Sequence, residues 1–94
     1  MKRTFSGILV AGLFLLGASE VLAQTRCRVM DPTGTPLNVR AAPNGSVVGQ
    51  LRNGRLVTVL ESSQDRRRRS WVYVADFSSG QPIGWVFREF VACF

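Results

Sequence analysis

The side chains whose type and spacing most clearly predict chemistry form a run of four consecutive arginines, Arg66, Arg67, Arg68 and Arg69. An arginine keeps its charge at any working pH, and its planar guanidinium donates paired hydrogen bonds to a carboxylate or a phosphate. The run therefore predicts an anion-binding site. The alternative is a solvated hairpin loop, because runs of like charge are usually exposed.

An aromatic-rich hairpin is expected between Trp71 and Phe87. Three-residue loops that end in glycine are common hairpin connections, and residues 78–80, Ser-Ser-Gly, fit that form, so that Phe77 would face Gln81. Extending this register gives two sets of side chains: the pairs Trp71 with Phe87 and Tyr73 with Trp85 on one face, and Val72, Val74 and Val86 on the other. We expect the valines in the core and the aromatic residues outside it.

The four paired aromatic residues are a candidate ligand-binding platform. Contiguous exposed apolar surface on a small protein usually marks a binding site, and aromatic rings suit a peptide or a sugar ring. The alternative is that the cross-strand pairs only stabilise the sheet, by about 0.2 to 1 kcal/mol each, while residues 26–35 cover them. Both interpretations are open at this point.

No catalytic, metal or cofactor site is expected. After residue 23 the sequence contains neither His nor Lys, so a Ser or Cys nucleophile has no customary base. Two distant cysteines without a histidine are too few ligands for zinc. Five carboxylates remain, and none lies in a motif that supports a glycosidase-like pair: Asp31, Glu61, Asp65, Asp76 and Glu89.

Residues 1–23 have the pattern of a cleaved signal peptide. A basic start precedes an apolar run at residues 7–17, and small residues lead to a cleavage point after Ala23. The apolar run is shorter than the ~20 residues that span a bilayer, so we expect no transmembrane anchor. The sequence predicts export to the periplasm or the medium, with one folded domain at residues 24–94.

The exported chain is strongly basic. Once residues 1–23 are removed, the chain has ten arginines and five carboxylates, which gives a net charge of +5. A basic patch usually suggests nucleic acid, but an exported protein meets little of it. We therefore expect no nucleic acid partner, and instead an anionic lipid headgroup, a wall polymer, a peptide carboxylate or an acidic protein face.

Cys27 and Cys93 are expected to form a disulfide. A domain of 71 residues buries little apolar surface, and a core of that size rarely supplies more than about 3 to 5 kcal/mol. Export takes both cysteines to an oxidising compartment. Closing a loop of some 65 residues would stabilise the fold by about 4 kcal/mol in the chain-entropy model. Two free thiols are the alternative.

The segments that position these residues are short strands. Apolar residues with a period of two, separated by Gly, Pro and Asn turns, favour strands over helices. Residues 62–70 would be a charged loop and residues 88–90 one 3₁₀ turn. Strands are expected at residues 37–41, 47–48, 56–60, 71–77, 81–87 and 91–93. Residues 56–60 are apolar on both faces, which indicates a central strand. Five or six such strands predict a small, partly open β-barrel.

The ordered pieces LNVR, VVG, NG and VTVL of residues 37–60, followed by SWVYV at 70–74 and GWV at 84–86, resemble the bacterial SH3 (SH3b) family over residues 36–91. The resemblance implies an all-β, SH3-like barrel that works by binding. It also implies recognition of cell-wall peptidoglycan, particularly its short peptides, or of a protein partner. We expect a monomer. The alternatives are an envelope accessory factor that binds another protein, or arginine-mediated adhesion to anionic surfaces.

Three further residues are expected to be structural. Asn38 would hydrogen-bond a neighbouring turn. Arg40 would pair with a carboxylate, either Asp31, Glu61 or Asp76, since polar groups near a core generally need a partner. Gly84 is expected where two strands approach closely.

Overall fold

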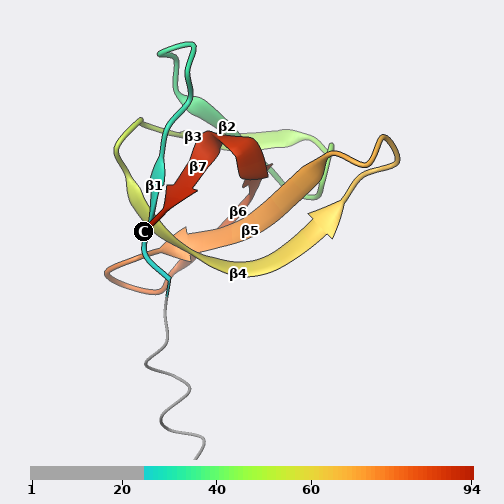
Figure 1. The fold of residues 1–94 in the computed structure, drawn as a ribbon. Helices are drawn as coiled ribbons and strands as arrows, with labels where there is room; N and C mark the ends of the chain where they lie inside the picture. Colours follow the sequence, from blue (N-terminus) through green and yellow to red (C-terminus); the bar gives the residue numbers. More distant parts are fainter. Residues whose placement is uncertain (1–24) are drawn as a thin grey trace, which may run out of the picture.

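The computed structural model describes residues 25–94, which form one antiparallel sheet (Figure 1). Its elements, in chain order, are β1 (Cys27–Val29), β2 (Leu37–Arg40), β3 (Val47–Leu51), β4 (Leu56–Gln64), β5 (Ser70–Asp76), β6 (Pro82–Phe87), the 3₁₀ helix η2 (Arg88–Phe90) and β7 (Val91–Cys93). In space the strands follow the order β3-β2-β6-β5-β4-β1-β7. The sheet curls but does not close, because β3 and β7 remain as its two edges. The predicted all-β, partly open barrel is confirmed.

The signal peptide predicted at residues 1–23 lies outside the described residues. Within residues 25–94, no helix is long and apolar enough to cross a membrane.

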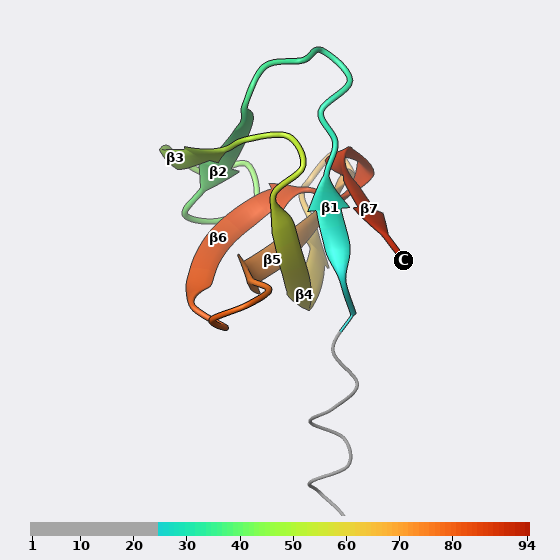
Figure 2. The ribbon, with the colours of Figure 1, turned by 90° about the vertical axis from the view of Figure 1, so that its left-hand side faces the viewer.

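The sheet contains seven strands, whereas five or six are expected from the sequence. The additional strand is β1, which lies within residues 26–35, the segment expected to cover the aromatic residues. It pairs with β4 on one side and β7 on the other (Figure 2). Three residues are too few to show a period of two clearly. Cys27 lies directly opposite Cys93 in the β1–β7 ladder, and the two form the predicted disulfide.

The charged loop is shorter than predicted. β4 continues to Gln64 and β5 already begins at Ser70, so the connection is residues 65–69 and not 62–70. A bulge at Leu60, between the pairs Val59 with Val74 and Glu61 with Tyr73, lets β4 bend and continue. The expected central position of β4 is confirmed, since it lies between β5 and β1.

The predicted register of the aromatic hairpin is confirmed in its body and wrong at its turn. Trp71 pairs with Phe87, and Tyr73 with Trp85. Nearer the turn the register shifts by one residue, because Ile83 has no partner of its own, and Phe77 does not face Gln81. The Gln81 carbonyl instead accepts from the N–H of Asp76, which leaves a four-residue connection, residues 77–80.

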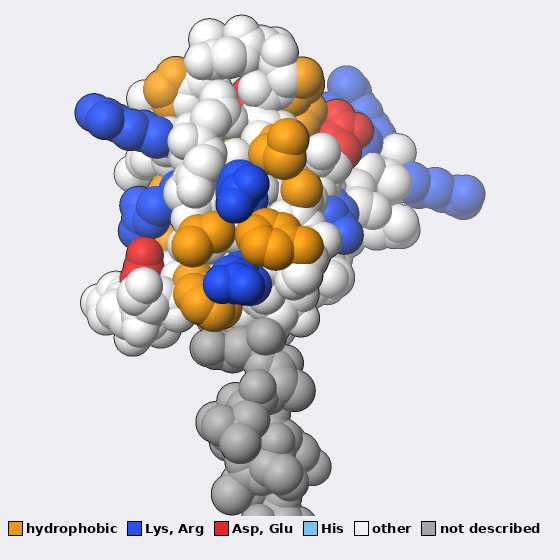
Figure 3. Space-filling model, turned by 60° about the vertical axis from the view of Figure 1, so that its left-hand side comes forward, with side chains coloured by type: hydrophobic (Ala, Val, Ile, Leu, Met, Phe, Trp, Pro, Cys, Tyr) orange, Lys and Arg blue, Asp and Glu red, His pale blue; other side chains and the backbone are white. Residues whose placement is uncertain are grey.

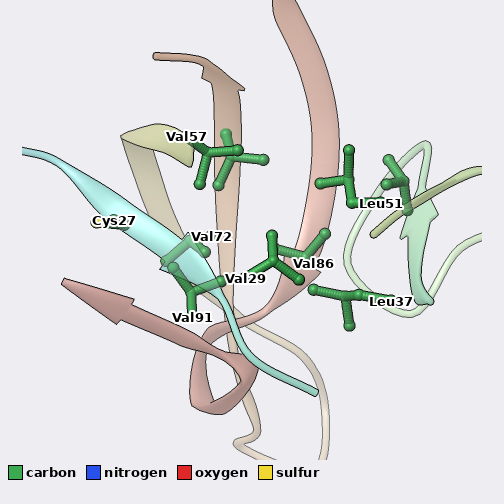
Figure 4. Packing of buried hydrophobic residues seen from close by; sticks show 10 residues of the cluster. Cys27, Val29, Leu37, Leu51, Val57, Val72, Val86 and Val91 are labelled. Carbon is green, nitrogen blue, oxygen red and sulfur yellow. The ribbon is translucent and has the colours of Figure 1, made fainter. Parts of the chain in front are cut away.

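The core is made of small branched side chains. The inward valines predicted from the hairpin, Val72, Val74 and Val86, are fully buried. They join Val29, Leu37 and other buried residues from five further strands, which point into the space enclosed by the sheet (Figure 4). All seven strands therefore contribute side chains to one core.

Gly84 lies where β6 closely approaches its neighbour β2, as predicted. A Cβ at this position would lie 2.5 Å from Val39 Cγ1 and 3.1 Å from the carbonyl oxygen of Arg40. Its φ of 151° is a conformation that other residues rarely adopt. Only glycine lets the two strands approach this closely, and their pairing places Arg40 opposite Trp85.

Candidate functional site

Asp65 organises the loop that carries the four arginines. Its Oδ1 accepts hydrogen bonds from the backbone N–H groups of Arg67 and Arg69, at 2.9 and 3.0 Å. Its Oδ2 accepts from Arg69 Nε at 2.9 Å and from the indole Nε1–H of Trp71 at 3.0 Å. The side chain is only 5% exposed. These donors, with Trp71 first, lower the pKa of Asp65 to about 2, so the loop is built around a fixed negative charge.

The four arginines do not form a single cluster. Arg66 and Arg67 line a hollow of about 410 Å³ together with Asn44 on the β2–β3 loop. Arg68 and Arg69 line a different hollow, of about 600 Å³. The division follows from the backbone, because Arg68 has a φ of 64° and turns the chain at this point. Only half of the predicted anion site therefore faces the aromatic hairpin.

The aromatic residues come together as predicted, but they differ in accessibility. Trp71 is 1% exposed. Its ring stacks on Phe87 with a centroid distance of 4.1 Å, and the guanidinium of Arg40 lies 6.0 Å from its centroid. The rings of Tyr73 and Trp85 contact each other with a centroid distance of 5.4 Å, and both residues are half-buried. The accessible part of the platform is thus Tyr73, Trp85 and Phe87, with Trp71 as their support.

Phe87 is the wall shared by two hollows. The larger hollow lies beside Arg68, Arg69, Ser70, Arg88 and Glu89. The smaller one, of about 140 Å³, lies between the aromatic residues and the segment that precedes β2; its walls are Asp31, Thr35, Pro36, Leu37, Asn38, Arg40, Trp71 and Phe90. The segment expected to cover the aromatic face therefore borders it at Phe87. Phe87 thus lines both hollows.

Positive charge is concentrated at the larger hollow. The Arg69 guanidinium lies 5.2 Å from the centroid of the Phe87 ring while its Nε donates to Asp65. Arg88 Nη1 donates to the carbonyl oxygen of Val91 at 2.7 Å, which holds that side chain in place. Arg68 is exposed. Three guanidiniums and the carboxylate of Glu89 thus line the hollow around an aromatic wall, and the guanidinium of Arg69 is ion-paired with Asp65.

Two predicted contacts are wrong. Arg40 pairs with none of the three carboxylates proposed for it, and its Nη1 donates to the Gly45 carbonyl oxygen at 2.7 Å. Asn38 does not bond a turn, because its Oδ1 accepts from the Gln50 side chain across the β2–β3 pair. The carboxylate of Asp76 forms an ion pair with Arg55 instead, with Arg55 Nη2 at 3.0 Å from Asp76 Oδ1. Sequence distance alone could not rank these partners.

A scan against protein-family models matches residues 35–92 with the bacterial SH3 domain. The chain belongs to this family. The match contains the arginine loop and the aromatic hairpin, and leaves β1 and both cysteines outside it. No curated protein and no solved structure matched.

The bacterial SH3 domain is a binding module. Residues 25–94 of this bacterial SH3 domain contain no group of three or more His, Cys, Asp or Glu side chains that could hold a metal ion.

Sequence reasoning overlooked Asp65 and Arg88 as site residues. Asp65 had a recognisable signal, since Asp at the start of a turn commonly bonds backbone N–H groups two residues later. Arg88 follows the aromatic hairpin directly, but its position beside Arg68 depends on how η2 turns the chain. Only the folded structure of this bacterial SH3 domain places Arg68 and Arg88 in one hollow.

Proposed function

We propose that this bacterial SH3 domain is an exported, non-catalytic binding module that recognises cell-wall peptidoglycan through its short peptides. The observation that supports the proposal is Phe87 as the shared wall of two hollows, one of them edged by three guanidiniums. Peptidoglycan peptides carry free carboxylates and small apolar side chains. A groove that combines an aromatic wall with arginine donors suits both groups.

Each residue has a distinct part in this proposal. Arg68 binds a ligand carboxylate, because its guanidinium is exposed. Arg88 adds positive charge that a backbone carbonyl holds in place, whereas Arg69, which is ion-paired with Asp65, shapes the wall of the hollow. Phe87 receives the apolar part of the peptide, while Tyr73 and Trp85 extend the aromatic surface. Trp71, being buried, supports Phe87.

Export is part of the same proposal. The Cys27–Cys93 disulfide is typical of proteins outside the reducing cytoplasm. Residues 1–23, with their basic start and apolar run, would deliver the domain at residues 24–94 to the periplasm or the medium. There the domain would meet peptidoglycan as a monomer.

A second candidate function is arginine-mediated adhesion to anionic surfaces. It is favoured by Arg66 and Arg67, which are exposed and lie away from the aromatic groove. Adhesion of this kind would be lost steeply as salt increases, whereas a shaped groove depends less on salt. Binding to an envelope protein is the third possibility.

The test is co-sedimentation of the oxidised protein with purified peptidoglycan sacculi at low and at physiological salt. Two matched variants each remove one charge: Arg68→Asn in the groove and Arg67→Asn outside it. Asparagine tolerates the positive φ of residue 68, so the loop is kept. A charge-assisted hydrogen bond contributes about 1.5 to 3 kcal/mol, so Arg68→Asn should weaken binding roughly tenfold to a hundredfold.

The outcomes separate the three candidates. Binding that persists in physiological salt and is weakened only by Arg68→Asn supports the groove. Equal weakening by both variants, together with loss in salt, points to adhesion. If the protein does not sediment with sacculi at all, peptidoglycan recognition is wrong and a protein partner is the next candidate.

A further inference from the structure

A second face of the domain carries positive charge that has no ion-pair partner among residues 25–94. Along β1 the residues alternate: Cys27 and Val29 are buried, while Arg26, Arg28 and Met30 point outward. This is the period of two that every strand imposes. Arg26 lies beside Phe94, which follows β7, because the Phe94 N–H donates to the carbonyl oxygen of Arg26. Met30, at the other end of β1, donates its N–H to the carbonyl oxygen of Phe90.

The arginines of this face are stacked on aromatic rings. The Arg28 guanidinium lies 5.0 Å from the centroid of Phe94, and the Arg26 guanidinium lies 5.3 Å from Phe94 and 5.8 Å from Phe77. Figure 3 shows arginine and hydrophobic side chains alternating on one face of the domain. Stacking fixes each guanidinium through its flat face and leaves its N–H edge free.

Neither guanidinium has an acceptor or a carboxylate partner among residues 25–94. The ion pairs found there join Arg55 to Asp76 and Arg69 to Asp65. The N–H donors of Arg26 and Arg28 are therefore preorganised and available. Binding at such a site loses little side-chain entropy, since the arginines are already ordered.

The face also has a place for an apolar side chain. Met30 and Phe94 are 55% and 61% exposed. Beside Met30 is a hollow of about 290 Å³, with Arg28 at its rim; its other walls are Val29, Asp31, Pro32, Asn53 and Gly54. The carboxylate in this wall, Asp31, already accepts from the backbone N–H and the hydroxyl of Thr33. A hollow with Arg28 at its rim, and with Arg26 two residues further along the chain, suits a ligand with both acidic and apolar groups.

We propose that this face, Arg26, Arg28, Met30, Phe77 and Phe94, is a docking surface for an extended, acidic segment of a partner protein. Residues two apart in a strand are about 6.6 to 6.8 Å apart. An extended segment with carboxylates at two alternate positions matches the spacing of Arg26 and Arg28. An apolar side chain at the next alternate position then enters the hollow beside Met30.

A flat lipid surface fits this face less well than a protein segment. Anionic headgroups would satisfy the arginines, at about 1 kcal/mol per charge, but they would not fill a concave site. The face is separate from the groove at Phe87, because the two share no residue apart from Asp31, which borders the hollows of both.

The experiment uses fluorescently labelled peptides in which glutamate occupies two alternate positions and leucine the next, with glutamine in place of glutamate as the control peptide. Binding is measured by anisotropy to the parent protein and to two double variants with the same loss of charge, Arg26→Gln with Arg28→Gln and Arg66→Gln with Arg67→Gln. All four positions are exposed, so both variants should fold.

We expect the acidic peptide to bind the parent protein and the Arg66/Arg67 variant alike, and the Arg26/Arg28 variant at least about tenfold more weakly. Amide chemical shifts should change at residues 26–30 and 92–94. Equal weakening in both variants, or shift changes centred on Phe87, would overturn the proposal. So would an absence of peptide binding, including the case in which phosphatidylglycerol vesicles bind instead.

Discussion

Trp71 donates its indole N–H to Oδ2 of Asp65 at 3.0 Å, and the same oxygen accepts from Arg69. One carboxylate thus joins the buried residue of the aromatic hairpin to the end of the arginine run. The stack of Phe87 on Trp71 extends this connection to the groove. The position of the groove's positive charge therefore depends on Asp65 remaining ionised.

Acid should destabilise the domain in a defined range. The pKa of Asp65 is lowered from 3.8 to about 2 in the folded protein, so the unfolded chain binds this proton more readily. The stability that Asp65 contributes is complete above pH 3.8 and is lost as the pH falls toward 2. Asp76, whose pKa is lowered chiefly by the Ser79 N–H, acts in the same direction. Urea unfolding at a series of pH values measures the effect.

The variant Trp71→Phe provides the control, because it keeps a ring against Phe87 and removes the largest cause of the pKa shift. We expect the pKa of Asp65 to rise toward 3.8 in this variant, measured by carboxyl ¹³C NMR titration. An unchanged pKa would contradict the hydrogen bond as its main cause.

Gly84→Ala should destabilise the domain by about 1 to 3 kcal/mol, the usual cost of overpacking. The added methyl group would meet Val39 Cγ1 at 2.5 Å, and the φ of 151° strains any residue but glycine. Gly49→Ala is the matched control, since a methyl group added there would have no atom within 4 Å beyond its chain neighbours. It should stay within about 1 kcal/mol of the parent. Similar chemical-denaturation midpoints for the two variants would refute the close approach.

Removing the disulfide should cost about 2 to 5 kcal/mol. Cys27 and Cys93 are 66 residues apart, so the bond closes nearly the whole domain. We expect the variant with both cysteines changed to Ala to unfold at lower urea concentration than the parent. A reductant should lower the midpoint of the parent and leave that of the variant unchanged. Two titratable thiols in the denatured, unreduced parent would disprove the bond.

Phe87→Leu should reduce sedimentation with peptidoglycan sacculi while the protein stays folded. Leucine keeps an apolar contact with Trp71 but removes the aromatic wall that the two hollows share. Val48→Ala, an exposed position on edge strand β3, serves as the control for general surface changes. Full binding by Phe87→Leu would exclude Phe87 as the ligand contact.

The body of the hairpin could be predicted from sequence because two departures from the expected hairpin, a longer turn and an unpaired residue in β6, offset each other in the register. The connection after Asp76 is one residue longer than a Ser-Ser-Gly loop requires, and the unpaired Ile83 restores the register before Gly84. The pairs Trp71 with Phe87 and Tyr73 with Trp85 therefore lie where expected. Bulges depend on the neighbouring strands, so a local pattern does not reveal them.

Accessibility was the part of the site that sequence could not supply. The register placed Trp71 and Tyr73 on the same face, but Trp71 is buried and Tyr73 half-buried, and only Trp71 donates a hydrogen bond to Asp65 in the loop at residues 65–69. The fold of this loop requires the Asp65 hydrogen bonds together with the length of β4. The arginine run was visible in the sequence, whereas its division at Arg68 is a property of one backbone angle.

The Cys27–Cys93 bond has a mechanical consequence. The bond joins neighbouring strands at the two ends of the described chain. A pulling force applied to those ends would pass through the sulfur atoms and bypass residues 28–92. The groove at Phe87 would therefore keep its shape under tension as long as the bond is intact, whereas in the reduced protein the same force would peel β1 and β7 from the sheet.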